Sequence, residues 1–116
     1  MYCTIKYINV ENELDFSKIE GFEWDEGNIN KNWKKHLVTN EEAEEVFINI
    51  PRVMLLDEKH SKFEKRYKVL GLTDKKRRLS ITFTIRNYKF RIISARDMNK
   101  KERSKYEEKI QSYSKI

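Results

Sequence analysis

The clearest pattern along the chain is a strict alternation of apolar and polar positions in its second half. Residues 79–85 alternate with a period of two, which predicts a strand that buries Leu79, Ile81, Phe83 and Ile85 on one face. Further β-rich runs lie at 52–57, 66–73 and 90–97. The connections at 74–78 and 86–89 are short and polar. We therefore expect four consecutive strands that pair as antiparallel neighbours.

The first half of the chain has a helical period instead. An amphipathic helix is predicted from about residue 25 to residue 36, and its apolar stripe is Ile29, Trp33, His36 and Leu37. A second helix starts at once, because Thr39 and Glu42 have the spacing of a capping box. Its stripe is Ala43, Val46, Phe47 and Ile50, and Pro51 ends it.

The two ends of the chain add weaker signals. Residues 22–25 alternate as a short half-buried strand, and residues 2–10 are rich in β-formers, whereas 11–19 show no period. Asn99 and Glu102 are placed to cap a last helix with the stripe Tyr106, Ile110 and Tyr113. The resulting fold class is α+β: a curved antiparallel sheet packed by two N-terminal helices and one C-terminal helix. We expect the aromatic residues on these stripes, and Trp24, to serve packing more than base stacking.

Composition and charge narrow the partners. A chain of 116 residues is the size of one domain, and 14 aromatic residues argue against disorder although only 38% of residues are hydrophobic. Residues 1–60 carry 7 Lys/Arg and 13 Asp/Glu, whereas residues 61–116 carry 18 and 6. A second half with a net charge of +12 favours RNA, DNA or an acidic protein as partner, although a lysine-rich solvated surface is equally consistent with it.

Several classes of protein are disfavoured by what the sequence contains. Cys3 is the single cysteine, so an internal disulfide or a cysteine-based metal cage is excluded, and with two histidines we expect no metal site. The sequence has neither an apolar run of membrane-spanning length nor a basic segment followed by an apolar one at its start. We therefore expect a cytoplasmic protein with no membrane association.

An ordered set of short motifs resembles one known family. The first half contains Phe22-Glu23-Trp24-Asp25-Glu26, Asn32, Lys35-His36, Glu41-Glu42-Ala43 and Val46-Phe47. The second half continues with Asp57, His60-Ser61, Glu64, Arg66, Gly71, Phe83-Thr84, Arg91-Ile92-Ile93-Ser94-Ala95-Arg96, Glu102-Arg103 and Tyr106. In order and spacing this set, which covers about residues 22–108, is similar to the BrnT family, the toxin half of a type II toxin–antitoxin pair.

The resemblance implies a RelE-like fold and a metal-independent endoribonuclease without a cofactor. It also implies a cognate antitoxin, expected to be a ribbon-helix-helix protein, that covers the toxin and binds operator DNA. Residues 22–116 would form the toxin domain, and residues 1–21 an extension of unknown role. Two positions depart from the family pattern. Leu37 replaces a usual Gly after the Lys-His pair, so we expect a differently shaped turn there, and Asn28 replaces a usual Lys.

RNA cleavage without metal needs an activated 2′-hydroxyl, stabilisation of negative charge on the phosphate and a proton for the departing 5′-oxygen. Arg66 and Arg96, at the start and the end of predicted strands, are candidates for binding the phosphate, with salt bridges as the alternative. His60 and Glu64 would lie on one face of a helical turn as a general acid/base pair, or belong to an ordinary solvated loop. His36 is a weaker candidate than His60 for the general base, because it lies on the apolar stripe of the first predicted helix.

The predicted RNA-binding residues are basic side chains outside that set: Lys35, Lys75, Lys76, Arg77, Arg78 and Arg91. The run at 75–78 could equally be a charged hairpin tip that keeps a turn soluble. Simple alternation puts Arg91 and Arg96 on opposite faces of the last strand, so that one of them can join a given site unless a bulge intervenes.

Two other functions stay open at this stage. A catalytically degenerate member would keep the fold and act as an antitoxin-binding and operator-binding module. A nucleic-acid-binding domain unrelated to toxin systems would carry the same charge pattern. A neighbouring gene for a ribbon-helix-helix protein would disfavour the unrelated domain, and growth arrest on expression without that protein would select the toxin.

Overall fold

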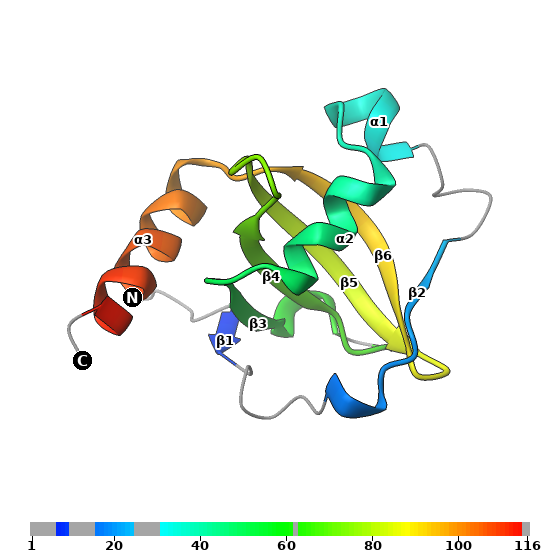
Figure 1. The fold of residues 1–116 in the computed structure, drawn as a ribbon. Coiled ribbons are helices and arrows are strands. Elements are labelled where there is room, and N and C mark those ends of the chain that lie inside the picture. The colour runs from blue at the N-terminus through cyan, green and yellow to red at the C-terminus, as the bar shows by residue number, and fades with distance from the viewer. Residues whose placement is uncertain (1–6, 10–15, 25–30, 62, 115–116) are drawn as a thin grey trace.

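The computed structural model describes residues 7–9, 16–24, 31–61 and 63–114. They form one sheet with helices on both sides (Figure 1). The elements are β1 (Tyr7–Asn9), a 3-10 turn η1 (Phe16–Lys18), β2 (Phe22–Glu23), α1 (Lys31–His36), α2 (Asn40–Ile48), β3 (Val53–Asp57), a 3-10 turn η2 (Glu58–His60), β4 (Tyr67–Leu72), β5 (Arg78–Arg86), β6 (Lys89–Asp97) and α3 (Lys100–Ser114).

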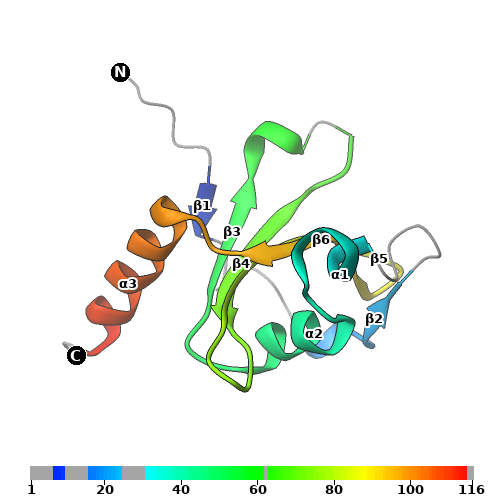
Figure 2. The same cartoon turned by 90° about the horizontal axis from the view of Figure 1, so that it is seen from above.

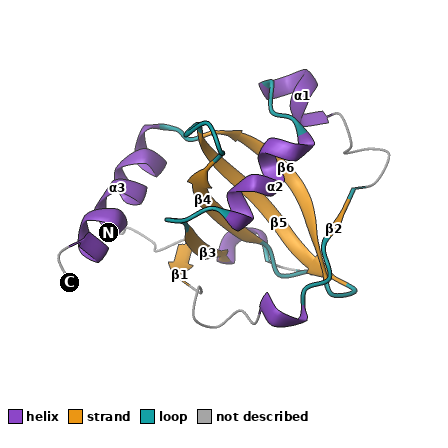
Figure 3. Cartoon of the chain, in the orientation of Figure 1, coloured by secondary structure: helices purple, strands orange, loops and turns teal. Residues whose placement is uncertain are grey.

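The sheet confirms the predicted meander. Its strand order is β1-β3-β4-β5-β6-β2, and β3 to β6 pair as antiparallel neighbours. The short strand β2 closes one edge and runs parallel to β6, whereas β1 pairs antiparallel with β3 at the other edge (Figure 3). The fold is therefore α+β, as expected. The described part of the N-terminal extension adds an edge strand to the sheet, and the remainder of the predicted strand at 2–10 lies outside the described residues.

One face of the sheet holds the larger core beneath α2. Phe47 of this helix stacks on Phe90 of β6 with ring centroids 4.5 Å apart and meets Phe83 of β5 at 4.9 Å. The helix approaches β4 closely at Gly71, where an added Cβ would lie 2.9 Å from a methyl carbon of Val46. A side chain at this position would push α2 off the sheet, so the glycine is needed for space.

The opposite face is only partly covered. Helix α3 lies on this side, across the sheet from α2 (Figure 2). Its Tyr106 packs with Met98 against Val53, Leu55 and Leu70 and donates a 2.6 Å hydrogen bond to the carbonyl of Pro51. The predicted cap is confirmed, because the side chains of Asn99 and Glu102 each accept a backbone N–H from the other residue. The predicted stripe is confirmed at Tyr106 and Ile110, which pack on one end of this face, whereas the surroundings of the Tyr113 side chain lie outside what the structure describes.

The prediction for the first helix was wrong in its buried face. Helix α1 is described from Lys31 to His36, and residues 25–30 lie outside the described residues. Trp33 and Leu37 are 51% and 61% exposed, whereas Asn32 is buried. Asn32 accepts a 2.9 Å hydrogen bond from the backbone N–H of Ala95 in β6. The described part of this helix is held against the edge of the sheet by this polar contact, and within residues 31–37 the predicted apolar stripe does not form.

The turn after α1 also differs from the expectation. Leu37 has a φ of 55°, and its N–H donates to the carbonyl of Trp33 at 3.0 Å. This is the left-handed helix end for which glycine is usual. The expected change of shape was wrong, because the leucine adopts the conformation that a glycine would. Asn28, the other departure, lies outside the described residues.

Helix α2 begins as predicted and ends earlier. The hydroxyl of Thr39 accepts the N–H of Glu42, and the Glu42 carboxylate accepts the N–H of Thr39, each at 3.0 Å. The predicted stripe is buried at Ala43, Val46 and Phe47. Ile50 was wrongly assigned to it, because the helix ends at Ile48 and Ile50 is 77% exposed.

Candidate active site

A bulge in β6 decides which side chains share a face of the sheet. Thr82 pairs with Ser94 but Phe83 pairs with Ile92, so Ile93 is an extra residue in β6. Beyond the bulge the alternation shifts by one, and Ile92 and Ala95 both face α2. Arg91 and Arg96 therefore lie on the same face, opposite α2, in the way that only a bulge allows.

The bulge coincides with the place where α1 meets the sheet. β2 pairs with β6 as far as Arg91, and among the described residues no strand pairs with the outer edge of β6 beyond that point. Lys31 Nζ donates to the carbonyl of Ile93 at 2.9 Å, and Asn32 takes the N–H of Ala95. Two side chains of α1 thus bind backbone groups of β6 at the bulge that a neighbouring strand would otherwise bind.

Beyond the end covered by α3, the same face carries polar side chains on three strands. β5 contributes Ser80, Thr82 and Thr84, and the register places Lys68 opposite Thr82, Arg91 opposite Thr84 and Arg96 opposite Ser80. Arg66 precedes β4 and continues its alternation next to Lys68. We call this side of the sheet the cationic face; it consists of Arg66, Lys68, Ser80, Thr82, Thr84, Arg91, Ser94 and Arg96, of which Lys68, Ser80 and Thr84 are buried.

A carboxylate from α3 binds one end of the cationic face. Glu102 receives two hydrogen bonds from the Arg96 guanidinium, at 2.7 and 3.0 Å, and one from the buried Lys68 ammonium at 2.8 Å. Burial alone would raise the pKa of Glu102, but the hydrogen bonds from Arg96, Lys68 and the Asn99 backbone outweigh it and lower the pKa to about 2. Arg96 thus forms a salt bridge, which was the alternative to phosphate binding in the sequence analysis.

Arg66 is held through its backbone and not through its side chain. Its N–H donates to the hydroxyl of Ser61 at 3.0 Å, and its carbonyl accepts the N–H of Asp57 at 2.8 Å. Among the described residues its half-buried guanidinium has no hydrogen-bond or ion-pair partner. A fixed backbone with an uncommitted guanidinium is the arrangement expected of a phosphate-binding arginine.

The predicted pairing of His60 with Glu64 on a helical turn was wrong. η2 ends at His60, so the two side chains do not share a helix face. His60 Nδ1 contacts the carboxylate of the buried Asp57 at 2.8 Å, which turns Nε2 away from Asp57. The Glu64 carboxylate instead accepts hydrogen bonds from the Arg86 guanidinium at 2.9 to 3.2 Å. His60 and Glu64 therefore have separate partners. Asp57 orients His60, whereas Glu64 binds Arg86 and so holds its loop against the end of β5.

The basic residues predicted to bind RNA divide into exposed ones and a structural one. Lys35, Lys75 and Lys76 are exposed, and Arg78 is exposed but pairs with Glu107 of α3. Arg91 lies on the cationic face.

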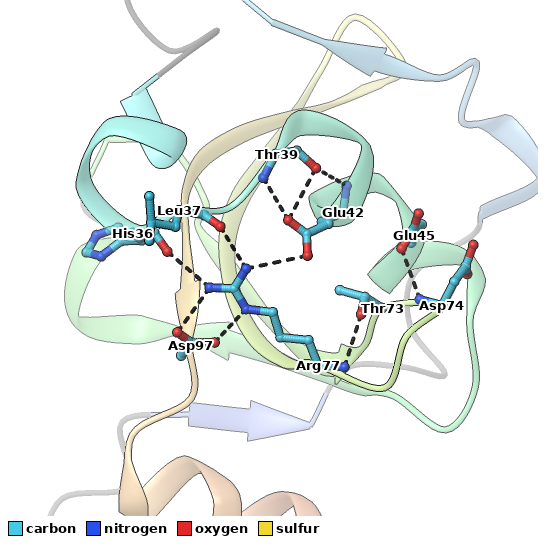
Figure 4. Close-up of polar contacts among 9 residues, drawn as sticks. All are labelled: His36, Leu37, Thr39, Glu42, Glu45, Thr73, Asp74, Arg77 and Asp97. Atoms are coloured by element: carbon cyan, nitrogen blue, oxygen red, sulfur yellow. Dashed lines mark hydrogen bonds and ion pairs between the residues drawn. The ribbon is translucent and has the colours of Figure 1, made fainter.

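Arg77 connects three parts of the fold through hydrogen bonds: the turn after α1, the start of α2 and the end of β6 (Figure 4). Its guanidinium donates to Asp97 at 2.8 Å, to Glu42, and to the carbonyls of His36 and Leu37 at 3.0 and 2.7 Å. Hydrogen bonding to Arg77 lowers the pKa of Asp97 although burial opposes it, and in return raises the pKa of Arg77. Arg77 thus ties the turn between α1 and α2 to the end of β6.

Other kinds of site are not evident in the described part of the chain. Residues 7–9, 16–24, 31–61 and 63–114 contain no group of three or more His, Cys, Asp or Glu side chains suited to a metal ion. No helix within the same residues is long and apolar enough to cross a membrane. Two surface grooves, at the end of α2 and along α3, are lined by none of the cationic-face residues.

Sequence reasoning missed three residues that shape this site. Asp57 and Lys68 lie in strands and are buried, although charged residues rarely are. Glu102 was interpreted only as a cap, yet the same carboxylate also binds both cations. The signal available for Asp57 was its place in the matching motif set, three residues before His60.

The fold and this face define a small α+β protein with a cationic sheet surface and a carboxylate-oriented histidine after β3. The family model described as the BrnT ribonuclease toxin of type II toxin–antitoxin systems matches residues 24–102. The match covers more than half of the chain, which therefore belongs to the BrnT family of ribonuclease toxins. A toxin of this type implies a cognate antitoxin. Among curated proteins no sequence matches the chain.

Proposed function

We propose that the protein is a metal-independent endoribonuclease toxin that binds RNA across the cationic face, between the 61–66 loop and β6. The observation that carries this proposal is the β6 bulge, because it brings Arg91 and Arg96 to the face that also holds Arg66 and Lys68. Lys68 is buried and, like Arg96, is paired with Glu102. Arg66 and Arg91 are therefore the arginines of this face that Glu102 does not bind and that we expect to meet the phosphates of an RNA chain. His60 follows β3, the strand next to β4, and is held by Asp57 at the end of that strand; we expect it to act on a ribose of the bound RNA.

The side chains present can perform the main steps of metal-free cleavage. Because Nδ1 of His60 faces the Asp57 carboxylate, Nε2 is left to accept the proton of the attacking 2′-hydroxyl. The Arg66 guanidinium stabilises the negative charge that develops on the phosphate. In this assignment water protonates the departing 5′-oxygen. Arg96, already held by Glu102, contributes to binding more than to charge stabilisation, and Glu64 is left out of the chemistry.

The test is RNA cleavage by the purified chain in excess EDTA. Attack by the neighbouring 2′-hydroxyl displaces the 5′-oxygen, so the 5′ fragment should end in a 2′,3′-cyclic phosphate. An RNA carrying a single 2′-deoxy residue at the cleaved position should survive. Cleavage that is lost in EDTA and restored by Mg²⁺ would contradict the proposal, and absence of cleavage in either buffer would favour the degenerate binding module.

We further propose that the antitoxin is an acidic ribbon-helix-helix protein that covers the cationic face and carries the pair to operator DNA in the cytoplasm. Residues 61–116 have a net charge of +12, and complementary charge favours an acidic partner. The affinity for this partner should fall as salt rises from 50 to about 500 mM. An affinity that does not change over this range would show that apolar contacts hold the pair together.

A further inference from the structure

Phe63 is the most exposed large apolar side chain among the described residues, at 99%. It lies in the loop between η2 and β4, three residues before Arg66 of the cationic face. Leaving a phenylalanine in water forgoes the stabilisation that burial of such a side chain provides. A single exposed apolar residue is common, so the exposure gains meaning only from what surrounds Phe63.

The loop that carries Phe63 is fastened on both sides of it. On one side the Ser61 hydroxyl donates to the carbonyl of Asp57 at 2.5 Å and accepts the N–H of Arg66. On the other side Glu64, the next residue, is bound by two nitrogens of Arg86. The ring is therefore presented from an anchored loop, which lowers the entropy lost when a ligand stacks on it.

The neighbours of Phe63 are those that bind a nucleotide. Arg66, three residues further along the chain, carries the guanidinium without a partner among the described residues, and His60 lies three residues before. Three residues span at most about 10 Å, so a ring at 63 lies within reach of a base attached to a phosphate at Arg66. Aromatic rings beside cationic grooves are the usual stacking surfaces for single-stranded nucleic acids.

We propose that Phe63 stacks on an unpaired base of the RNA next to the phosphate bound at Arg66, and so makes the protein selective for single-stranded RNA. The inference rests on the proposed function, because it uses the same face. It adds a specificity residue that sequence analysis did not single out. A base in a duplex is already stacked between its neighbours, so Phe63 would not gain this contact there.

The binding of a labelled single-stranded RNA tests the proposal independently of cleavage. The probe is a fluorescein-labelled 12-mer of mixed sequence with 2′-O-methyl groups throughout, which cannot be cut by its own 2′-oxygens. Phe63→Ala and Phe63→Leu should weaken binding by about 5- to 150-fold, because stacking contributes about 1–3 kcal/mol per base. Phe63→Trp should keep the parental affinity. All three should melt like the parent, because the side chain is almost fully exposed and has little packing to lose.

Controls separate stacking from other effects. Tyr88→Ala removes another exposed aromatic ring, at the β5–β6 turn, and should bind the probe like the parent. The same 12-mer in duplex form should bind Phe63→Ala and the parent alike. Equal losses for single strand and duplex, or no loss for Phe63→Leu, would overturn the proposal.

Two further outcomes distinguish this inference from the proposed function. If Phe63→Ala binds the probe normally but loses the coexpressed antitoxin, the ring belongs to the antitoxin surface and the inference fails. If Phe63→Ala and Arg66→Ala both weaken probe binding but Arg66→Ala keeps the parental cleavage rate, the stacking role stands and the assignment of Arg66 to catalysis fails.

Discussion

The two faces of the sheet are built from the same strands and serve different purposes. Along β5, Leu79, Ile81 and Phe83 point into the apolar core under α2, and the residues between them point to the cationic face. The α2 face is held by packing of rings and methyl groups. The opposite face is apolar only beneath α3, and next to this helix it is held by the ion pairs of Glu102.

This difference teaches where the fold and the chemistry are encoded. Apolar packing depends little on pH and salt, so the α2 face can define the architecture under all conditions. Charged side chains on the other face are held by partners that titrate, so their arrangement depends on pH. A strand that alternates between these two roles lets a small domain carry a site without weakening its main core.

The largest effect is expected from Glu102→Gln, which breaks the charge network of the cationic face. A pKa of Glu102 lowered to about 2 from its ordinary value of 4.5 corresponds to about 3 kcal/mol of stability at neutral pH. We therefore expect Glu102→Gln to unfold at lower urea concentration than the parent at pH 7, by an amount equivalent to about 2–4 kcal/mol. Equilibrium urea unfolding followed by circular dichroism measures it.

The pH dependence of the same pair sharpens the comparison. Because the pKa of Glu102 is lower in the folded than in the unfolded protein, its contribution is complete above pH 4.5 and is lost as pH falls toward 2. The difference in the free energy of unfolding between the parent and Glu102→Gln should therefore become smaller as the pH falls from 4.5 toward 2. If the two proteins have the same free energy of unfolding at pH 7, or if their difference stays unchanged down to pH 2, apolar packing and not the Glu102 ion pairs stabilises both faces of the sheet.

A smaller effect, of opposite sign, is expected at the turn that leads into α2. Leu37 adopts the left-handed conformation, which costs a residue with a side chain about 1–2 kcal/mol, and its exposed side chain has little burial to lose. We expect Leu37→Gly to raise the free energy of unfolding by about 1 kcal/mol, and Leu37→Ala, which keeps the Cβ, to gain nothing. Equal stabilities of Leu37→Gly and the parent would show that the turn carries no strain.

Much of the fold could be predicted because local rules agree with one another in the strands and in α2. Alternation located β5, and the Thr39–Glu42 spacing located the start of α2. The predictions failed where tertiary contacts outweigh local pattern. Asn32, a polar residue, is buried in α1 because it satisfies the edge of β6, and Trp33 is exposed.

The site was less predictable for a related reason. Which arginines share a face depends on one inserted residue in β6, and alternation alone gives the opposite answer for Arg91 and Arg96. The basic run at 75–78 looked uniform in sequence, yet Arg77 is committed to Asp97 and two carbonyls while Lys75 is exposed. Charge and spacing do not reveal such commitments. The roles assigned to Arg66 and His60 therefore remain predictions.

The most direct test of the account compares two arginines of different predicted role, Arg66 and Arg77, in the same preparation. RNA cleavage and thermal melting are measured for Arg66→Ala and Arg77→Ala. Loss of a charge-stabilising donor should lower the cleavage rate of Arg66→Ala by about 10²–10³, with stability within about 0.5 kcal/mol of the parent. Arg77→Ala should lose about 1–3 kcal/mol of stability and keep its cleavage rate per folded molecule. If Arg66→Ala melts and cleaves like the parent, the site is not on the cationic face.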